Sequence, residues 1–333
     1  MTSVAGSADS FLPDDARAVE LDRQVRARLG ESLASLADAL SEAAIGADAV
    51  RGAASDVHFA PVTPALFALH AGLVEAILDE DGPAAERMLA GFNRPGGFTA
   101  RGTAFATLDD ASLAVPGLAA VYAGLAIDDA TSGVTLAPLA NDEMPAAVER
   151  VREALDLLAR AAPELAAEIG ALVHQVVLVR SAAGSERTFG GASSFHLWGA
   201  VFLNADRHQG RVAMAEGLVH EAAHLLLFGV AGGERVVEND DADRFASPLR
   251  EDPRPLDGIA HATFVLARMA YCAERLIASG ALSPAERESA ATALARHRED
   301  FGDGAAVLTA NARLSPAGAH MLEAATRYMI GQA

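Results

Sequence analysis

The chain has 333 residues, 51% of them hydrophobic and 21% charged, which is typical of one large or two smaller folded domains and excludes a disordered protein. A formal net charge of −19 argues against nucleic acid as a partner, because the phosphates would be repelled. A single cysteine, Cys272, excludes an intrachain disulfide and a cysteine-rich metal cluster.

The first half of the chain is expected to be mainly helical. Residues 1–12 are small and polar and predict a flexible tail, without the basic and apolar regions of a signal peptide. Apolar residues then recur at threes and fours over 13–49, 64–79, 83–90 and 141–170, which predicts helices. Residues 91–141 mix short apolar runs with Gly and Pro and predict short strands or irregular structure. We therefore expect residues 13–171 to form a helical N-terminal region.

The pattern changes near Leu172. The β-branched run 173–179 predicts a strand, and residues 194–204 predict one or two more. Helices are predicted over 210–228, 258–279, 283–300 and 315–330, with a polar, Pro-rich loop over 230–257. The predicted fold class is α+β and predominantly helical, with a small sheet beside the helix over 210–228 in a zincin-like core. Residues 172–333 would then be the metal-binding catalytic region.

The predicted helix over 210–228 contains the pattern His220-Glu221-x-x-His224 within an apolar run. Residues four apart share one face of a helix, so both imidazoles can reach one metal ion. Burying three polar side chains among Leu, Val and Ala is unfavourable without a partner, and a metal ion would provide one. His220 and His224 are therefore candidate metal ligands, and Glu221 is the candidate catalytic residue.

A third protein ligand is needed to complete such a site. We favour His261, because the helix predicted over 258–279 follows a loop long enough to bring it across the cavity. Glu238 is the alternative, and the other downstream acids are Asp240, Asp241 and Asp243.

Two arginines, Arg250 and Arg254, lie in the loop just before His261. A guanidinium can grip a carboxylate through two parallel hydrogen bonds, so the pair suggests a site for a dicarboxylate or a peptide carboxylate. Upstream of the motif, the segment 193–198 suggests a strand edge beside the cleft that could pair with an extended peptide. Trp198, the only tryptophan, would line that cleft or lie in the core.

Three segments of the chain are informative together: Val219-His220-Glu221-Ala222-Ala223-His224, Ser247-Pro248-Leu249-Arg250 and Asp252-Pro253-Arg254-Pro255-Leu256-Asp257-Gly258-Ile259-Ala260-His261. Their combination resembles a family, the bacterial "HEXXH motif" peptide-modification proteins that are encoded with ribosomally made peptide natural products. The resemblance covers about residues 173–271, with a weaker similarity at 314–318.

Members of that family look like iron- and 2-oxoglutarate-dependent peptide β-hydroxylases. The resemblance implies Fe(II) held by His220, His224 and His261, with Arg254 or Arg250 on the distal carboxylate of 2-oxoglutarate. The implied substrate is a residue in a peptide with a leader segment, or a free or carrier-bound amino acid. A set of three histidines departs from the usual two histidines and one carboxylate of such oxygenases.

Two other functions stay open. A zinc metallopeptidase would use Glu221 as general base on a metal-bound water. A non-catalytic peptide-binding protein would keep a structural metal. The sequence predicts no oligomeric state, no membrane partner and a cytoplasmic location, and it leaves open whether the helical N-terminal region recognises a leader peptide.

Overall fold

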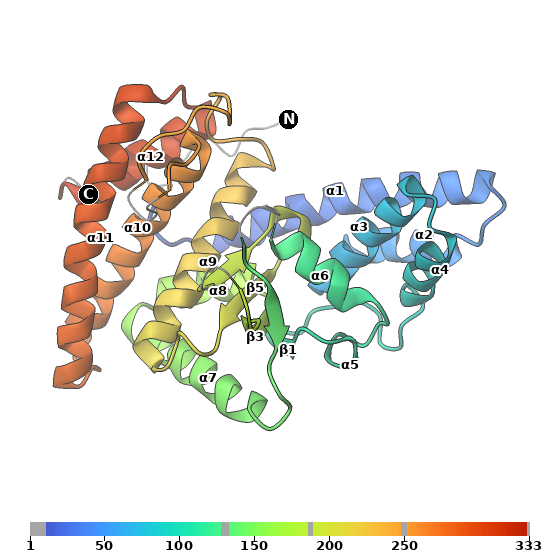
Figure 1. The fold of residues 1–333 in the computed structure, drawn as a ribbon, viewed down its shortest axis with the longest axis horizontal. Coiled ribbons are helices and arrows are strands. Elements are labelled where there is room, and N and C mark those ends of the chain that lie inside the picture. The colour runs from blue at the N-terminus through green and yellow to red at the C-terminus, as the bar shows by residue number, and fades with distance from the viewer. Residues whose placement is uncertain (1–10, 128–132, 186–188, 248–251, 332–333) are drawn as a thin grey trace.

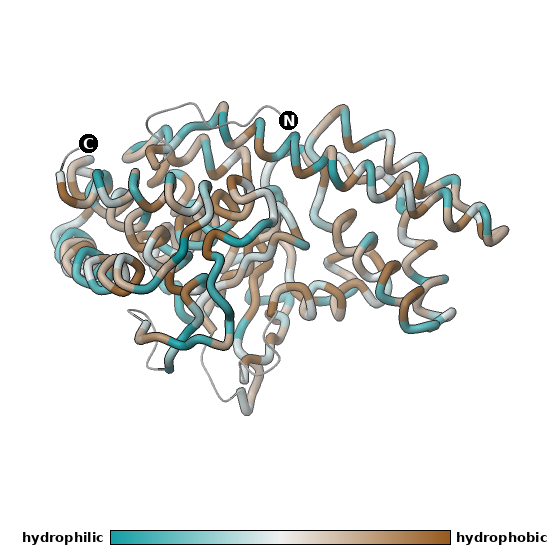
Figure 2. Tube along the Cα trace, turned by 90° about the horizontal axis from the view of Figure 1, so that it is seen from above, coloured by the Kyte–Doolittle hydropathy of each residue, from teal (hydrophilic) through white to brown (hydrophobic). Residues whose placement is uncertain are grey.

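The computed structural model describes residues 11–127, 133–185, 189–247 and 252–331. Helices make up 62% of the chain and surround a small mixed sheet of five strands, so the predicted α+β, predominantly helical class is confirmed. Figures 1 and 2 show an elongated molecule, with a helical arm at one end and the sheet in the body.

The arm is built from the first four helices. They are α1 (Asp15–Glu42), α2 (Asp48–Asp56), α3 (Pro64–Leu78) and α4 (Gly82–Gly91). Asp14 begins α1 by accepting a hydrogen bond from the Arg17 backbone N–H at 2.9 Å. The single helix predicted over 13–49 is wrong after Glu42, where the backbone turns through a left-handed residue at Ala44 before α2. The helices predicted over 64–79 and 83–90 are confirmed.

The segment predicted as irregular or as short strands contains both strands and helices. Its elements are β1 (Ala104–Thr107), α5 (Asp110–Leu113), α6 (Leu118–Ala126) and β2 (Leu136–Pro138). The helix predicted over 141–170 is two helices, α7 (Met144–Ala161) and α8 (Pro163–Leu172). The break falls before Pro163, because a proline disfavours helical backbone in the residue that precedes it.

The sheet has the strand order β1-β3-β5-β4, with β2 paired to β3. Its later strands are β3 (Gln175–Ser181), β4 (Gly191–Ser193) and β5 (Ala200–Asn204), with the short 3₁₀ helix η1 (Phe195–Leu197) between the last two. Strands β1, β3 and β5 are parallel, and β4 is an antiparallel edge strand. The strand predicted over 173–179 is confirmed. Of the one or two strands predicted over 194–204, β5 is present, whereas residues 195–197 form η1. The strand edge predicted over 193–198 is wrong after Ser193, and β4 begins before that segment.

The motif lies on α9 (Arg211–Ala231), which packs against β4, β5 and α7. The helix ends where Gly232 takes up a left-handed conformation with φ of 66°, as the glycines after the motif predict. The C-terminal helices are α10 (Leu256–Ala278), α11 (Pro284–Asn311) and α12 (Pro316–Met329). Helix α11 continues past the predicted end at residue 300. In the part of the chain that the structure describes, no helix is long and apolar enough to cross a membrane.

Trp198 belongs to the core, so the alternative that it lines a cleft is wrong. It is fully buried, and its indole N–H donates to Asp22 at 3.1 Å. The Asp22 carboxylate also contacts Arg26 at 2.7 Å and His174 at 3.0 Å. This buried network joins α1 to the residues that immediately precede β3 and β5.

Candidate metal centre

The three candidate histidines lie together between α9 and α10. Residues four apart on α9 place the His220 and His224 rings with their centroids 5.0 Å apart. Helix α10 packs against α9 and brings the His261 ring against that of His224, with centroids 5.6 Å apart and an angle of 20° between the rings. The structure therefore brings together the residues that the sequence singled out across a separation of 37 positions.

Two of the three rings have donor atoms at a spacing that a shared metal ion would allow. The Nδ1 atoms of His224 and His261 face each other at 3.4 Å. Two nitrogens bonded to one tetrahedral ion at about 2.0–2.1 Å lie about 3.4 Å apart, so this pair already has the spacing of two ligands. The third ring is less well placed: His220 turns its Nδ1 toward the Met269 sulfur at 3.4 Å.

The three rings do not converge on a single point. Within the described residues, no group of three or more His, Cys, Asp or Glu side chains is arranged to hold a metal ion. A shared ion would require at least the His220 ring to turn about its side-chain bonds. Met269 is therefore a neighbour of the candidate centre that the sequence did not reveal, although it lies two turns after His261 on the same helix.

Burial among apolar side chains keeps two of the imidazoles neutral. It lowers the pKa of His224 to about 3, with the facing His261 as a second cause. Burial likewise lowers the pKa of His261 to about 4. Neutral imidazole is the form that binds metal, so neither ring needs to lose a proton at neutral pH.

These pKa values predict how the stability of the metal-free protein depends on pH. Between pH 6.5 and 4, each of the two imidazoles is protonated in the unfolded chain but not in the folded chain. The free energy of unfolding should therefore fall as the pH falls, by about 1.4 kcal/mol per pH unit for each imidazole. Urea denaturation of chelator-treated protein across this window measures the slope. The variant His261→Gln should remove one of the two contributions, and an unchanged slope would contradict the prediction.

Glu221 lies on the side of α9 that faces the edge strand. Its side chain is 4% exposed, and its Oε2 accepts a hydrogen bond from the Ser193 hydroxyl at 2.9 Å. Its Oε1 lies 3.9 Å from the Nε2 of His220. Burial raises the pKa of Glu221 to about 8, and the hydrogen bond from Ser193 opposes this shift. The carboxyl is thus next to a candidate ligand and already engaged by a second residue.

Asp257 supports the cluster from the first turn of α10. Its Oδ2 lies 3.9 Å from the Nε2 of His261, on the ring edge away from His224. Its Oδ1 accepts hydrogen bonds from the backbone N–H groups of Val236 and Val237, both at 3.1 Å. The distance between Oδ2 and Nε2 is too long for a hydrogen bond, so Asp257 acts on the cluster through these backbone contacts, which hold the first turn of α10 against residues 236–237.

The other predicted site residues are less informative. Arg254 forms an ion pair with Asp252 at 3.0 Å, and its backbone pairs with Phe245, so its assignment to a 2-oxoglutarate carboxylate stays a prediction. Arg250 lies outside the described residues. Glu238 is exposed, and its backbone N–H donates to the Arg313 carbonyl at 2.7 Å. The exposed positions of Asp240, Asp241 and Asp243 likewise do not favour them as ligands.

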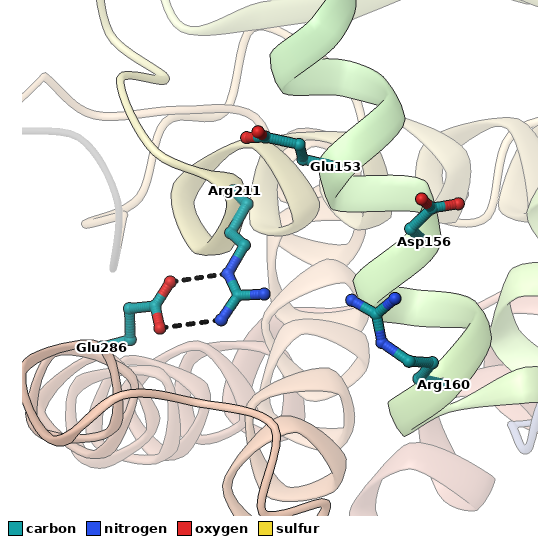
Figure 3. Close-up of a pocket in the computed structure, with 5 residues that line it drawn as sticks. All are labelled: Glu153, Asp156, Arg160, Arg211 and Glu286. Atoms are coloured by element: carbon teal, nitrogen blue, oxygen red, sulfur yellow. Dashed lines mark hydrogen bonds and ion pairs between the residues drawn. The ribbon is translucent and has the colours of Figure 1, made fainter.

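A surface hollow of about 450 Å³ lies at the N-terminal end of α9. Figure 3 shows its charged lining: Arg211 binds both oxygens of Glu286, and three further side chains project from α7, namely Glu153, Asp156 and Arg160. Arg211 is the first residue of α9, so the hollow begins about 13 Å along the helix axis from His220. We interpret it as a surface ion-pair network separate from the histidine cluster.

No protein-family model matches the chain, and no curated protein sequence matches it.

Proposed function

We propose that the chain is an Fe(II)- and 2-oxoglutarate-dependent oxygenase that hydroxylates the β-carbon of a residue in a peptide. The proposed ligands are His220, His224 and His261, and the sheet edge with the motif helix would form a zincin-like core. The observation that supports an oxygenase is the approach of His261 to His224, with their Nδ1 atoms 3.4 Å apart, because His261 ends the Arg- and Pro-rich segment on which the resemblance depends. An oxygenase of this class needs no strong protein base, whereas a peptidase needs the motif glutamate on a metal-bound water.

The residues of the chain would bind and orient the reactants. When bound, iron with 2-oxoglutarate and O₂ would supply the oxidising chemistry: one oxygen atom of O₂ enters the substrate as the hydroxyl, the other leaves in succinate, and carbon dioxide is released. The imidazoles of His224 and His261 are neutral and spaced for one ion, which supports metal binding. Arg254, with Arg250 as the second candidate, would hold the distal carboxylate. Because Arg254 now pairs with Asp252, the co-substrate would have to share or replace that partner.

The proposed substrate is an extended peptide. A carrier-bound or free amino acid is the alternative substrate. Strand β4 pairs only with β5 among the described strands, so its other edge is available for backbone hydrogen bonds to a peptide. That edge runs beside α9, which bears two of the proposed ligands. The helical arm offers a separate surface for a leader segment.

A zinc metallopeptidase is the second candidate, and one distance favours it. Glu221 Oε1 lies 3.9 Å from His220 Nε2, close enough for the carboxylate to act on a water bound at the same metal. In this case zinc would replace iron, and His261 or Glu238 would be the third ligand.

The variant Glu221→Gln separates the two functions. A glutamine keeps the shape of the side chain, and its carbonyl can still accept the hydrogen bond from Ser193. For an oxygenase, we expect the iron-loaded variant to convert 2-oxoglutarate to succinate, and to add one oxygen atom to a test peptide, within about tenfold of the wild-type rate. For a zinc peptidase, loss of the general base would lower peptide cleavage by about 10²–10⁴-fold.

Succinate measurement and peptide mass spectrometry report hydroxylation by the iron-loaded protein, and mass spectrometry also reports peptide cleavage. The control is the wild-type chain loaded with zinc in place of iron. Absence of succinate and of a mass gain from the iron-loaded wild type would contradict the oxygenase proposal, and zinc-dependent cleavage that disappears in Glu221→Gln would replace it with the peptidase.

A further inference from the structure

The edge strand β4 touches the catalytic motif through two of its three residues. Successive side chains of a strand point to opposite faces, so Gly191 and Ser193 face the same way. Both face α9, because Ser193 donates to Glu221 and the Gly191 α-carbon lies against the same carboxyl. Ala192 lies between them and points to the other face of the sheet.

The two residues contact different oxygens of the Glu221 carboxyl. Ser193 Oγ is 2.9 Å from Oε2. A β-carbon added to Gly191 would lie 2.3 Å from Oε1 and 3.0 Å from the Phe202 carbonyl oxygen, so only glycine leaves room for the carboxyl in this position. The Ser193 hydrogen bond thus selects Oε2, and it leaves Oε1 on the side of His220.

The strand is also anchored at its beginning. The Asn204 side chain donates to the Phe189 carbonyl at 2.7 Å, and its backbone N–H donates to the Gly190 carbonyl at 3.0 Å. His208 contacts the Gly190 carbonyl at 3.0 Å and the Ala213 carbonyl in the first turn of α9 at 3.1 Å. With these anchors at one end and Ser193 at the other, β4 is held against the motif helix along its whole length.

We propose that Ser193 is a positioning residue that acts through Glu221, with Gly191 providing the space that this contact needs. The contact fixes the position of the β4 edge relative to the histidines on α9. For the proposed function, on which this inference rests, it sets the distance between a peptide paired with β4 and the metal ligands. Because a displacement of about 1 Å at a reacting centre can lower a rate by about 10²-fold, the contact would govern kcat more than KM.

Four variants test the role of Ser193 in the full chain. Ser193→Ala removes the donor, and Ser193→Thr keeps a hydroxyl on the same atom. Ser194→Ala is the matched control, because that neighbouring serine instead accepts a hydrogen bond from the His196 backbone N–H. Gly191→Ala places a methyl group where the carboxyl lies.

Two readouts do not depend on turnover. In the metal-free chain, Ser193→Ala should speed amide hydrogen exchange of residues 191–193 by about five- to tenfold, the factor expected from losing one hydrogen bond. In the chain loaded with Co(II), it should shift the visible absorption bands, because Glu221 is no longer held beside His220. Gly191→Ala should change both readouts in the same direction, whereas Ser193→Thr and Ser194→Ala should match the wild type.

Turnover gives a third readout. Ser193→Ala should lower kcat by about tenfold or more with a smaller change in KM for the peptide, and Ser193→Thr should restore kcat. Exchange rates and a Co(II) spectrum of Ser193→Ala that equal those of the wild type would overturn the inference. Failure of the wild-type chain to convert 2-oxoglutarate would overturn the proposed function alone, because the exchange rates and the Co(II) spectrum decide the role of Ser193 separately.

Discussion

Replacing His261 with alanine should weaken binding of Fe(II) or Co(II) by more than about hundredfold. His261 supplies the nitrogen that faces His224 at 3.4 Å, so its loss removes one of the two rings already spaced for a common ion. Loss of a residue that merely orients a ligand lowers metal affinity by about 10–100-fold, and loss of a ligand itself should exceed that range. Titration of the metal-free chain with Co(II), followed by visible absorption, measures the effect.

Two controls make this prediction specific. His196→Ala removes an exposed imidazole on η1, outside the cluster, and should leave the affinity unchanged. Glu238→Gln tests the alternative third ligand. Loss of Co(II) binding in Glu238→Gln, but not in His261→Ala, would make the Glu238 carboxylate the third ligand. The contact between the His224 and His261 rings would then be a packing contact only.

The histidine cluster could be predicted because its signal is local. The spacing of His220 and His224 requires only a helix, and the apolar run around them is enough to predict one. His261 followed from a more general argument, since an isolated histidine on a later helix needs a partner when it is buried. The structure places it against His224, although the orientation of the His220 ring toward Met269 could not be predicted from any spacing.

The edge strand and the arrangement of the loop could not be predicted in the same way. Strand β4 is three small residues, Gly-Ala-Ser, without the β-branched side chains that indicate a strand. The segment 193–198 was expected to form a strand edge, but the contact of Ser193 with Glu221 depends on tertiary packing, so no pattern in the sequence indicated it. The apolar run that forms α6 is compatible with a strand or a helix by periodicity alone, and packing decided the outcome. Arg254 had a clear chemical preference for carboxylates, but that preference did not distinguish Asp252 from a ligand.

The variant Glu168→Gln should destabilise the protein by about 3–5 kcal/mol, through a buried ionic network that supports the ligand helix. Glu168 on α8 is 2% exposed and binds Arg268 of α10, which is 1% exposed, and Arg17 of α1 at 2.9 Å. It also accepts a hydrogen bond from the Asp14 backbone N–H at 3.0 Å. Removing its charge takes from the buried Arg268 guanidinium the carboxylate that it binds, which is more costly than any hydrogen bond lost with it.

The same helix provides a matched control. Glu164 lies one turn earlier on α8 and faces Arg275 of α10 at 3.9 Å, but the two side chains are 57% and 45% exposed. Glu164→Gln should therefore change the free energy of unfolding by no more than about 1 kcal/mol. Urea denaturation of both variants measures the difference in the free energy of unfolding. Adding Arg268→Met to Glu168→Gln should recover part of the loss, because it removes the uncompensated charge of Arg268. Equal effects of Glu168→Gln and Glu164→Gln would show that the buried network contributes no more than a surface pair to holding α10 against α8 and α1.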